Sequence, residues 1–259
     1  MLTTQRILLL LLPLIAGSLL RPRTKHTFGT ALAGHKERTL LLTAHPDDET
    51  FFFSPTLTAL SYSSMHGLGD IFVVSLSTGN AKGLGDARRE EFGRALEIFG
   101  IREERRSILD HPYLQDNKTS AWDPAVIAEE IHPLVVEHNI TTILTFDSHG
   151  ITGHPNHRSA LAGAVHLISS TLLLSPSTVC PRLFTLYSRP STKHLGPLAA
   201  FVAPGYISSP GPVFVASLVD YVTALRAMSK HPSQLRLIPF MKGLFSRYLW
   251  VNEWVEVTM

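Results

Sequence analysis

The segment His45-Pro46-Asp47-Asp48-Glu49 places one imidazole and three carboxylates within five residues. It directly follows residues 39–44, a run of apolar and β-prone residues that predicts a buried strand. Charged groups near a protein core must be paired or must hold a metal, because burying an isolated charge is costly. The segment therefore points to a metal site or a polar network at the end of a strand.

A second histidine cluster, His154-Pro155-Asn156-His157, lies far downstream. A residue before proline avoids the helical region, and proline is favoured at the first position of a helix. We therefore expect His154 to end a loop and His157 to lie in the first turn of a helix, where residues three apart can face one side. An HxxH spacing alone is also typical of a solvated loop with surface histidines.

The same reasoning places His45 at the end of its strand and starts a helix at Pro46, with Asp47, Asp48 and Glu49 in the first turn. Acidic residues there complement the helix dipole, so a purely structural interpretation explains one or two of the carboxylates. It does not explain an imidazole at the mouth of the strand. For His45 and Asp48, a metal pair and a helix cap remain equally good interpretations.

Strand and helix patterns alternate along the chain, which predicts a single α/β domain with a Rossmann-like, mostly parallel sheet and helices on both faces. Ligands of such sheets bind at the carboxyl ends of the strands, where both polar segments fall. Residues 188–214 resemble a loop, and the aromatic segment 241–257 could lie at a membrane interface. We expect strands at residues 39–44, 71–77, 106–109, 141–146 and 183–187, and helices at residues 49–64, 86–99, 124–138, 155–173 and 215–230.

The composition indicates a single domain and excludes several kinds of partner and site. The chain has 259 residues, of which 44% are hydrophobic, and this suits one domain with a full core. Its net charge of only +2, without a basic stripe, argues against a nucleic-acid partner. Cys180 is the single cysteine, so an intrachain disulfide and a thiolate-rich zinc site are both excluded.

The N-terminal segment reads as a hydrophobic membrane anchor over residues 1–22, followed by a linker over 23–37 and a catalytic domain over 38–259. Its apolar run, residues 7–20, is shorter than the about 20 residues that usually span a bilayer. A cleaved signal peptide, a short signal anchor and an interfacial helix are the alternatives. The excess of Lys and Arg on the C-terminal flank favours an anchor with a cytoplasmic body, which would leave the sequons at Asn117 and Asn139 unused.

Taken together, these motifs resemble the LmbE-like (PIG-L) de-N-acetylase family, over about residues 39 to 250. The His45–Glu49 segment matches the family signature, and the leader and tail are most similar to the eukaryotic branch, which acts on N-acetylglucosaminyl-phosphatidylinositol. The aromatic and arginine run that often follows the C-terminal HxSQ segment is missing. The further matching segments are Ser77-Thr78-Gly79-Asn80, Gly83-Leu84-Gly85 with Arg88 and Glu91, Phe146-Asp147, Gly153 to His157, and His231-Pro232-Ser233-Gln234.

The resemblance implies that His45, Asp48 and His157 bind one Zn²⁺, although iron or manganese would accept the same ligands. It implies that Asp47 is the general base, and that a protonated His154 stabilises the oxyanion. Spacing alone does not say which of Asp47 and Asp48 is the ligand; that assignment comes from the resemblance.

Other matching residues would bind the substrate or support the site. Arg88 is expected to bind the substrate phosphate, but an exposed helix arginine paired with Glu91 is nearly as good an interpretation. Asn80 and Asp147 are candidates for binding sugar hydroxyls. The residues expected to support the site from behind are Glu49, Glu91, His231 and Gln234.

The expected reaction is hydrolysis of the acetamide of GlcNAc-phosphatidylinositol, the second step of GPI-anchor synthesis, at the cytoplasmic face of the endoplasmic reticulum membrane. A deacetylase of another N-acetyl sugar would keep the chemistry and change the substrate. A non-catalytic membrane scaffold with the same fold would have lost ligands or base, and all of them are present.

Overall fold

The computed structural model describes residue 28 and residues 36–174, 180–189, 211–235 and 246–259. The expected anchor, most of the linker and most of the 188–214 segment lie outside these ranges. Within them, no helix is both long and apolar enough to cross a membrane.

Seven strands of the described chain form one mixed sheet in the order β3-β2-β1-β4-β5-β7-β6. The first five are parallel, β7 runs antiparallel to β5, and β6 runs antiparallel to β7. The chain leaves β1 in one direction and β4 in the other, which creates a switch point between their carboxyl ends. The strands are β1 (Glu37–Thr43), β2 (Gly69–Ser75), β3 (Arg106–Ile108), β4 (Thr142–Phe146), β5 (Arg182–Leu186), β6 (Val213–Val215) and β7 (Val251–Glu256).

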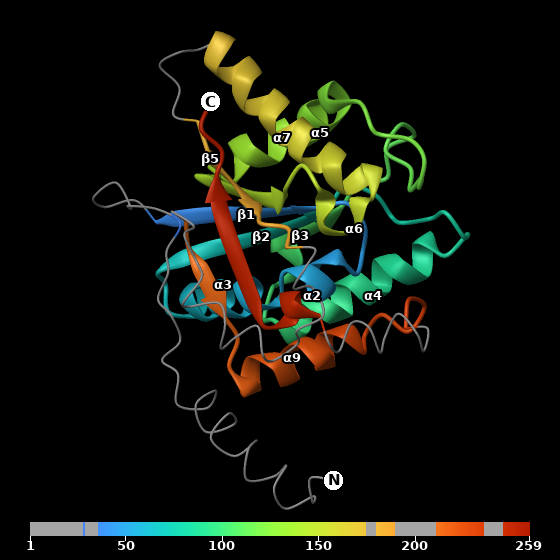
Figure 1. The fold of residues 1–259 in the computed structure, drawn as a ribbon, viewed down its shortest axis with the longest axis vertical. Helices are drawn as coiled ribbons and strands as arrows, with labels where there is room; N and C mark the ends of the chain where they lie inside the picture. Colours follow the sequence, from blue (N-terminus) through green and yellow to red (C-terminus); the bar gives the residue numbers. More distant parts are fainter. Residues whose placement is uncertain (1–27, 29–35, 175–179, 190–210, 236–245) are drawn as a thin grey trace, which may run out of the picture.

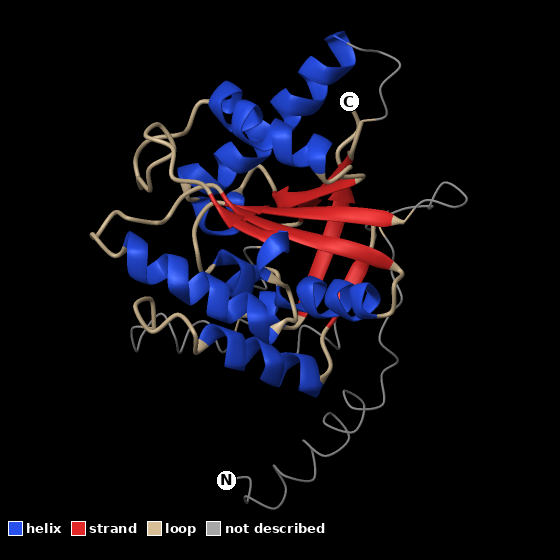
Figure 2. Ribbon diagram, turned by 180° about the vertical axis from the view of Figure 1, so that it is seen from behind, coloured by secondary structure: helices blue, strands red, loops and turns tan. Residues whose placement is uncertain are grey.

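Helices cover both faces of this sheet (Figures 1 and 2). The helices α5 (Pro124–Glu137) and α7 (Pro155–Leu174) lie on one face, and α2 (Asp48–Phe52), α3 (Ser54–Met65), α4 (Gly85–Ile98) and α9 (Leu218–Met228) lie on the other. Short segments complete the described chain: α6 (Gly150–Gly153), η1 (Glu103–Arg105) and η3 (Arg247–Leu249). The predicted α/β class, with a mostly parallel sheet, is confirmed.

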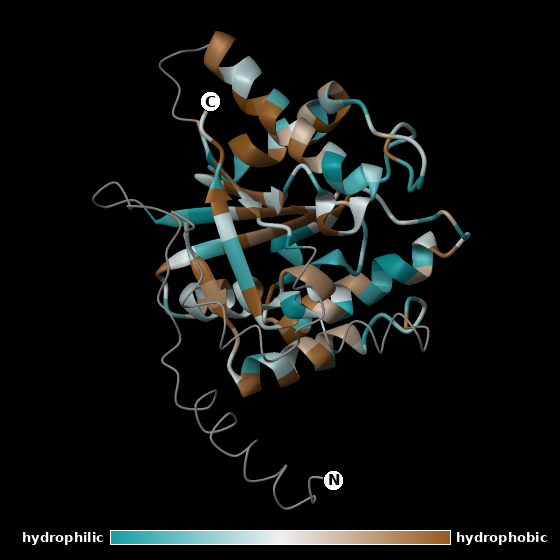
Figure 3. Cartoon of the chain, viewed as in Figure 1, coloured by the Kyte–Doolittle hydropathy of each residue, from teal (hydrophilic) through white to brown (hydrophobic). Residues whose placement is uncertain are grey.

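The residue pattern explains these elements. Leu40, Leu41 and Leu42 are all buried, because helices cover β1 on both sides and a parallel central strand then needs no polar face. The mostly polar α4, teal in Figure 3, buries one apolar stripe that includes Phe92 and Leu96. Asp123 caps α5 by accepting a hydrogen bond from the Ala125 N–H, as its position before Pro124 predicts.

Several boundaries differ from the sequence prediction by a few residues, and the helix after β1 differs most. The helix expected over residues 49–64 is divided at Phe53 into α2 and α3. Pro46 and Asp47 lie before α2, and Asp47 has a φ of 119°, outside the helical region. A non-glycine residue with positive φ is strained, so this turn must be stabilised by its surroundings.

The tail also requires a correction. Residues 213–215 form β6 rather than loop, and β7 adds an unpredicted strand beside β5. Tyr248, Trp250 and Trp254 are buried in the domain, where Trp254 stacks on Phe53. For these three side chains the expected position at a membrane interface is wrong, because they are buried inside the domain: Trp254 and Tyr248 pack on Phe53 and Phe52, and Trp250 stacks on Tyr221 of α9.

Candidate metal centre and active site

The turn after β1 is organised by Asp48. Its Oδ2 accepts hydrogen bonds from the backbone N–H groups of Ala44 and His45, at 3.1 and 2.9 Å. This leaves Oδ1 facing His157, 3.2 Å from its Nε2. The carboxylate therefore holds the turn with one oxygen and presents the other to the second histidine cluster, which comes from the start of α7 on the opposite face.

The ring of His157 has a defined orientation. Its Nδ1 lies 3.0 Å from the carbonyl oxygen of Gly150, so Nδ1 carries a proton and, in the neutral ring, Nε2 keeps its lone pair. The ring also stacks on Phe146, with centroids 4.1 Å apart. Gly150 has a φ of 61°, and a Cβ there would meet the His157 Cβ at 2.9 Å, so this close approach requires glycine.

The orientation of His45 is defined in the same way. Its Nε2 lies 3.2 Å from Asn156 Oδ1 and 3.3 Å from Asp116 Oδ1, and both of these atoms are hydrogen-bond acceptors. Asn156 Oδ1 accepts a bond from the Asn117 N–H as well, which fixes its identity as oxygen. In the neutral ring the proton of His45 is therefore on Nε2, which leaves the lone pair on Nδ1, 3.7 Å from Asp48 Oδ2. Burial disfavours the charged ring, but the carboxylates of Asp116, Asp48 and Asp47 outweigh it and raise the pKa of His45.

These lone pairs fit a bound cation. In their neutral forms His45 Nδ1 and His157 Nε2 present lone pairs beside the carboxylate of Asp48, and a divalent metal accepts this set of nitrogen and oxygen donors. One nitrogen from each of His45, His154 and His157 also lies within 4.8 Å of the others. The residues present therefore suit a metal ion at the switch point of the sheet.

His154 differs from the other two histidines. Its Nδ1 accepts a hydrogen bond from the Asn156 N–H at 3.2 Å, so the neutral ring carries its proton on Nε2. Burial and the neighbouring His45 and His157 lower the pKa of His154 to about 4. The lowered pKa disfavours the protonated His154 that the resemblance implies, and the neutral ring still offers one N–H donor.

Burial and neighbouring charges give the adjacent carboxyl groups of Asp47 and Asp48 different pKa values. Burial opposes ionisation of Asp48, but His157 and His45 outweigh it and hold the pKa of Asp48 well below its usual range. Burial raises the pKa of Asp47 to about 6, although Arg88 lies with Nη2 only 3.3 Å from Asp47 Oδ1 and opposes the shift. Two neighbouring carboxyl groups thus differ in proton affinity, as separate ligand and proton-transfer roles require.

Arg88 is buried rather than exposed, so its interpretation as a surface arginine paired with Glu91 is wrong. Its Nη1 donates to the Gly79 carbonyl oxygen at 2.8 Å and its Nη2 donates to the Pro46 carbonyl oxygen. Gly79 has a φ of 66°, and a Cβ there would lie 2.4 Å from Nη1 of this guanidinium. Through these hydrogen bonds Arg88 stabilises the turn that carries Asp47.

The other expected substrate-binding residues have partners within the chain. Asn80 is exposed, and its Oδ1 accepts a bond from the Gly85 N–H at the start of α4. Asp147 is buried and accepts bonds from the N–H groups of His149 and Gly150 and from both the N–H and the hydroxyl of Ser188. Its carboxylate organises the loop between β4 and α7.

A buried hydrogen-bond network stabilises the turn that carries Asp47. Glu49 Oε2 accepts the Asp47 N–H at 2.9 Å, and Glu49 Oε1 lies 2.6 Å from His231 Nε2. Glu91 accepts bonds from the N–H and hydroxyl of Ser233, and the Gln234 amide donates to the same hydroxyl. The structure therefore brings all four expected supporting residues to the side of the site formed by α2, α4 and the end of α9.

Asp116 was missed by sequence reasoning. It lies between β3 and α5, and its carboxylate approaches His45 at 3.3 Å, Arg88 at 3.8 Å and His154 at 3.9 Å. No motif surrounds it in the sequence, and 66 residues separate it from Glu49 and 37 from His154, so the sequence does not reveal the contact. Asn156 was also missed as a site residue. It lies between His154 and His157 in the sequence, and this position was the available signal.

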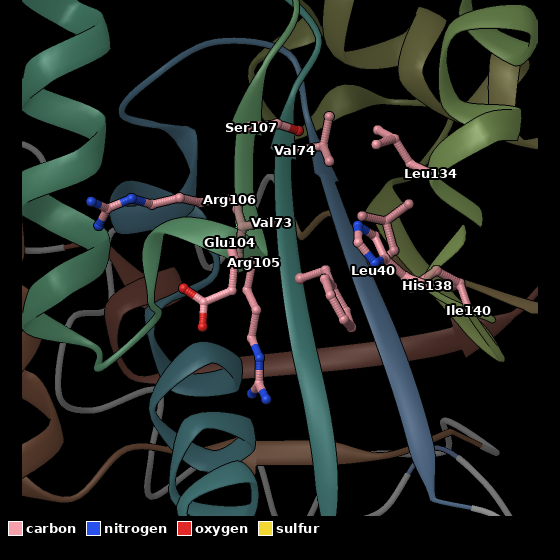
Figure 4. Close-up of a pocket in the computed structure, with 11 residues that line it drawn as sticks. Leu40, Val73, Val74, Glu104, Arg105, Arg106, Ser107, Leu134, His138 and Ile140 are labelled. Atoms are coloured by element: carbon pink, nitrogen blue, oxygen red, sulfur yellow. The ribbon is translucent and has the colours of Figure 1, made fainter. Parts of the chain in front are cut away.

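A separate small cavity of about 50 Å³ lies over the β1–β2–β3 part of the sheet (Figure 4). Its lining includes Phe72, Arg105 and His138, and the ring of Phe72 stacks on that of His138. None of the expected site residues lines it, so it is distinct from the candidate metal centre.

The switch-point geometry defines the class: an α/β protein whose site combines nitrogen and oxygen donors that suit a metal ion, a carboxyl group with a raised pKa and a neutral N–H donor. A sequence model of the family described as PIG-L: GlcNAc-PI de-N-acetylase matches residues 40–168. The chain is 32% identical over 230 residues to the N-acetylglucosaminyl-phosphatidylinositol de-N-acetylase of Bos taurus, a match covering 85% of this chain and 84% of the bovine protein. The chain belongs to the PIG-L family.

A second relative is the probable N-acetylglucosaminyl-phosphatidylinositol de-N-acetylase of Schizosaccharomyces pombe, 38% identical over 135 residues. That match covers 52% of this chain and 53% of the yeast protein, so it spans about half of each. Among solved structures, the N,N'-diacetylchitobiose deacetylase from Pyrococcus horikoshii has a TM-score of 0.61 at 14% identity, covering 99% of this chain and 94% of that chain. At this identity the likeness shows the shared fold.

Proposed function

We propose that this protein hydrolyses the acetamide of GlcNAc-phosphatidylinositol to give GlcN-phosphatidylinositol and acetate, the second step of GPI-anchor synthesis. The observation that carries the proposal is the convergence of His45, Asp48 and His157, with their lone pairs facing one another, beside Asp47. The names of the bovine and yeast relatives supply the substrate.

The metal would be held by His45 Nδ1, the Asp48 carboxylate and His157 Nε2, and we propose Zn²⁺ because it favours a few nitrogen and oxygen ligands. When bound, a divalent cation of this kind supplies Lewis-acid activation of water and of the amide carbonyl. Phe146 and Gly150 hold the ring of His157 in place, so the ligand geometry is set before the metal arrives.

Asp47 is the proposed general base and acid. Its carboxylate takes the proton of the attacking water and returns it to the nitrogen of the leaving amine. A pKa raised by burial to about 6 suits both steps, because the group is ionised at neutral pH and still holds a proton readily. Arg88, 3.3 Å away, keeps the carboxylate oriented while it changes charge.

His154 is the proposed donor to the oxyanion. The Asn156 N–H on Nδ1 directs the ring proton to Nε2, where it can donate to the carbonyl oxygen as negative charge develops. The carboxylate of Asp116 lies near this imidazole and is 13% exposed, and we propose that it accepts a hydrogen bond from a sugar hydroxyl.

The proposed location is the endoplasmic reticulum membrane with the domain in the cytoplasm. It is supported by the apolar run at residues 7–20 and the basic residues that follow it. The membrane association would come from that segment, since the tail aromatics Tyr248, Trp250 and Trp254 are buried.

The experiment that tests the function measures acetate release by the purified full-length chain from GlcNAc-phosphatidylinositol in detergent. We expect turnover that a chelator abolishes and that added Zn²⁺ restores. N,N'-diacetylchitobiose serves as the comparison substrate. Release from the chitobiose alone would assign the chain to another N-acetyl sugar, and release from neither substrate by a folded, metal-loaded protein would contradict the proposal.

A further inference from the structure

Two arginines share one buried glutamate at the carboxyl end of β5. Glu253 in β7 accepts bonds from Arg189 Nε at 2.8 Å and Nη2 at 3.2 Å, and from Arg247 Nη1 at 2.9 Å. No second carboxylate forms an ion pair with either arginine among the residues that the structure describes. The cluster of Arg189, Arg247 and Glu253 therefore carries one positive charge in excess.

This excess charge is built into the fold and can be reached by solvent. The Arg247 side chain is only 4% exposed, and its Nε is buried without a hydrogen-bond partner. The Arg189 side chain is 30% exposed, and its guanidinium lies over the ring of Tyr187, itself a partly exposed residue. Burial and the charge of Arg189 both lower the pKa of Arg247, although Glu253 opposes the shift. A partly exposed guanidinium in a cluster with excess positive charge suits an anionic ligand.

The cluster lies on the same edge of the molecule as the candidate metal centre. The Arg189 N–H donates to the Tyr248 hydroxyl, and the ring of Tyr248 is 6.1 Å from that of Phe52. Phe52 in turn lies 5.8 Å from the ring of His157. Figure 1 shows η3, which carries Arg247, beside α2. Two aromatic side chains, Tyr248 and Phe52, thus lie between the backbone of Arg189 and a metal ligand.

Arg88, the sequence-based candidate for the phosphate, is poorly placed for that role. Its two terminal nitrogens already donate to the carbonyl groups of Gly79 and Pro46. The carboxylates of Asp47 and Asp116 flank it at 3.3 and 3.8 Å and would repel a phosphate anion. In the substrate, the glucosamine and inositol rings lie between the acetamide and the phosphodiester. When the acetamide is at the candidate metal centre, the phosphate therefore lies away from it.

We propose that Arg189, backed by the buried charge of Arg247, binds the phosphodiester of the inositol phospholipid substrate. The inference rests on the proposed function and adds to it the group that recognises the anion. Nε and Nη2 of Arg189 donate to Glu253, so the phosphate would bind along the remaining Nη1–Nη2 edge, where two parallel N–H groups match its oxygen geometry. Stacking on Tyr187 restricts the side chain of Arg189 beforehand, which lowers the entropy cost of binding.

The test compares two substrates that differ only in the anion: short-chain GlcNAc-phosphatidylinositol and GlcNAc-inositol, both in an uncharged detergent. For Arg189→Gln we expect KM for the phospholipid to rise about ten- to hundred-fold, because hydrogen bonds to a charged group are lost. The kcat for the phospholipid and the turnover of GlcNAc-inositol should stay unchanged. Arg189→Lys keeps the charge and should give an intermediate KM. Arg94→Gln, which removes an exposed arginine on α4, is the matched control and should change neither substrate.

The outcomes separate this inference from the proposed function. Equal losses on both substrates, or no loss on either, would overturn the assignment of Arg189. If the wild-type chain turns over neither substrate, the proposed function fails, and calorimetry with glycerophosphoinositol still tests the cluster: binding lost in Arg189→Gln supports it, and equal binding refutes it. A weaker attachment of Arg189→Gln to phosphatidylserine vesicles, with an unchanged KM in detergent, would assign the cluster to membrane lipid and overturn the proposal.

Discussion

The buried pair of His231 and Glu49 holds the turn that carries Asp47, and replacing His231 by alanine tests this directly. The two side chains are 0% exposed and 2.6 Å apart, and the other oxygen of Glu49 accepts the Asp47 N–H. Asp47 has a φ of 119°, a conformation that costs about 1–3 kcal/mol and persists only where surrounding contacts impose it. Without His231, Glu49 would be a buried charge with no cationic partner.

We expect His231→Ala to lower the free energy of unfolding by about 3–5 kcal/mol, the usual cost of breaking a buried pair. That is a large part of the about 5–15 kcal/mol that stabilises a typical domain. The assay is urea unfolding followed by circular dichroism at pH 6, with bound metal and kcat measured on the folded variant. Because the Asp47 turn loses its support, kcat should fall while the metal content stays close to that of the wild type.

The pH dependence gives a second readout. Burial disfavours the charged ring, but Glu49 outweighs it and raises the pKa of His231. A raised folded-state pKa means that the pair stabilises fully below the unfolded value of about 6.5 and loses this contribution as pH rises through the folded-state pKa. The stability difference between wild type and His231→Ala should therefore be largest at or below pH 6 and shrink at higher pH.

A double-mutant cycle with Glu49→Gln and His231→Gln measures the coupling, which we expect at about 0.5–3 kcal/mol. His166→Ala, at an exposed histidine of α7, is the control and should stay within about 0.5 kcal/mol of the wild type. If His231→Ala unfolds within that same margin, or if the two substitutions are additive, His231 does not support the turn.

Three further results should follow from the site. Asp47→Asn should abolish acetate release while metal content, measured by mass spectrometry, stays intact; normal turnover would exclude Asp47 as the base. In the wild type, kcat should rise with pH through about 6, because Asp47 must be ionised and its pKa is raised by burial; a flat profile from pH 5 to 7 would contradict this assignment. Gly79→Ala should destabilise the fold and reduce kcat, because the new Cβ would meet Arg88 at 2.4 Å. Gly83 has a similar φ and open space around it, so Gly83→Ala measures the backbone cost alone. Equal effects of the two substitutions would refute the packing argument.

Local patterns in the sequence were sufficient for strands β1–β5, for α3, α4, α5, α7 and α9, and for the two polar segments. The apolar run before His45 predicted the end of β1, and His154-Pro155 predicted the start of α7, because these boundaries depend on backbone preferences of neighbouring residues. Both segments do lie at the carboxyl ends of β1 and β4 or in the loops that follow them. The α/β class followed from the alternation of such elements, which requires no knowledge of distant contacts.

The tertiary structure decided what each side chain faces. Asp116 reaches His45 from a loop with no motif, and Arg88 is buried against the Asp47 turn although its helix is mostly polar. The tail aromatics, including Trp254, pack inside because β7 joins the sheet beside β5, a long-range pairing that the local sequence does not encode. Burial, the proton positions on the histidine rings and the pKa values all depend on such distant neighbours, so they become defined only when the chain is folded.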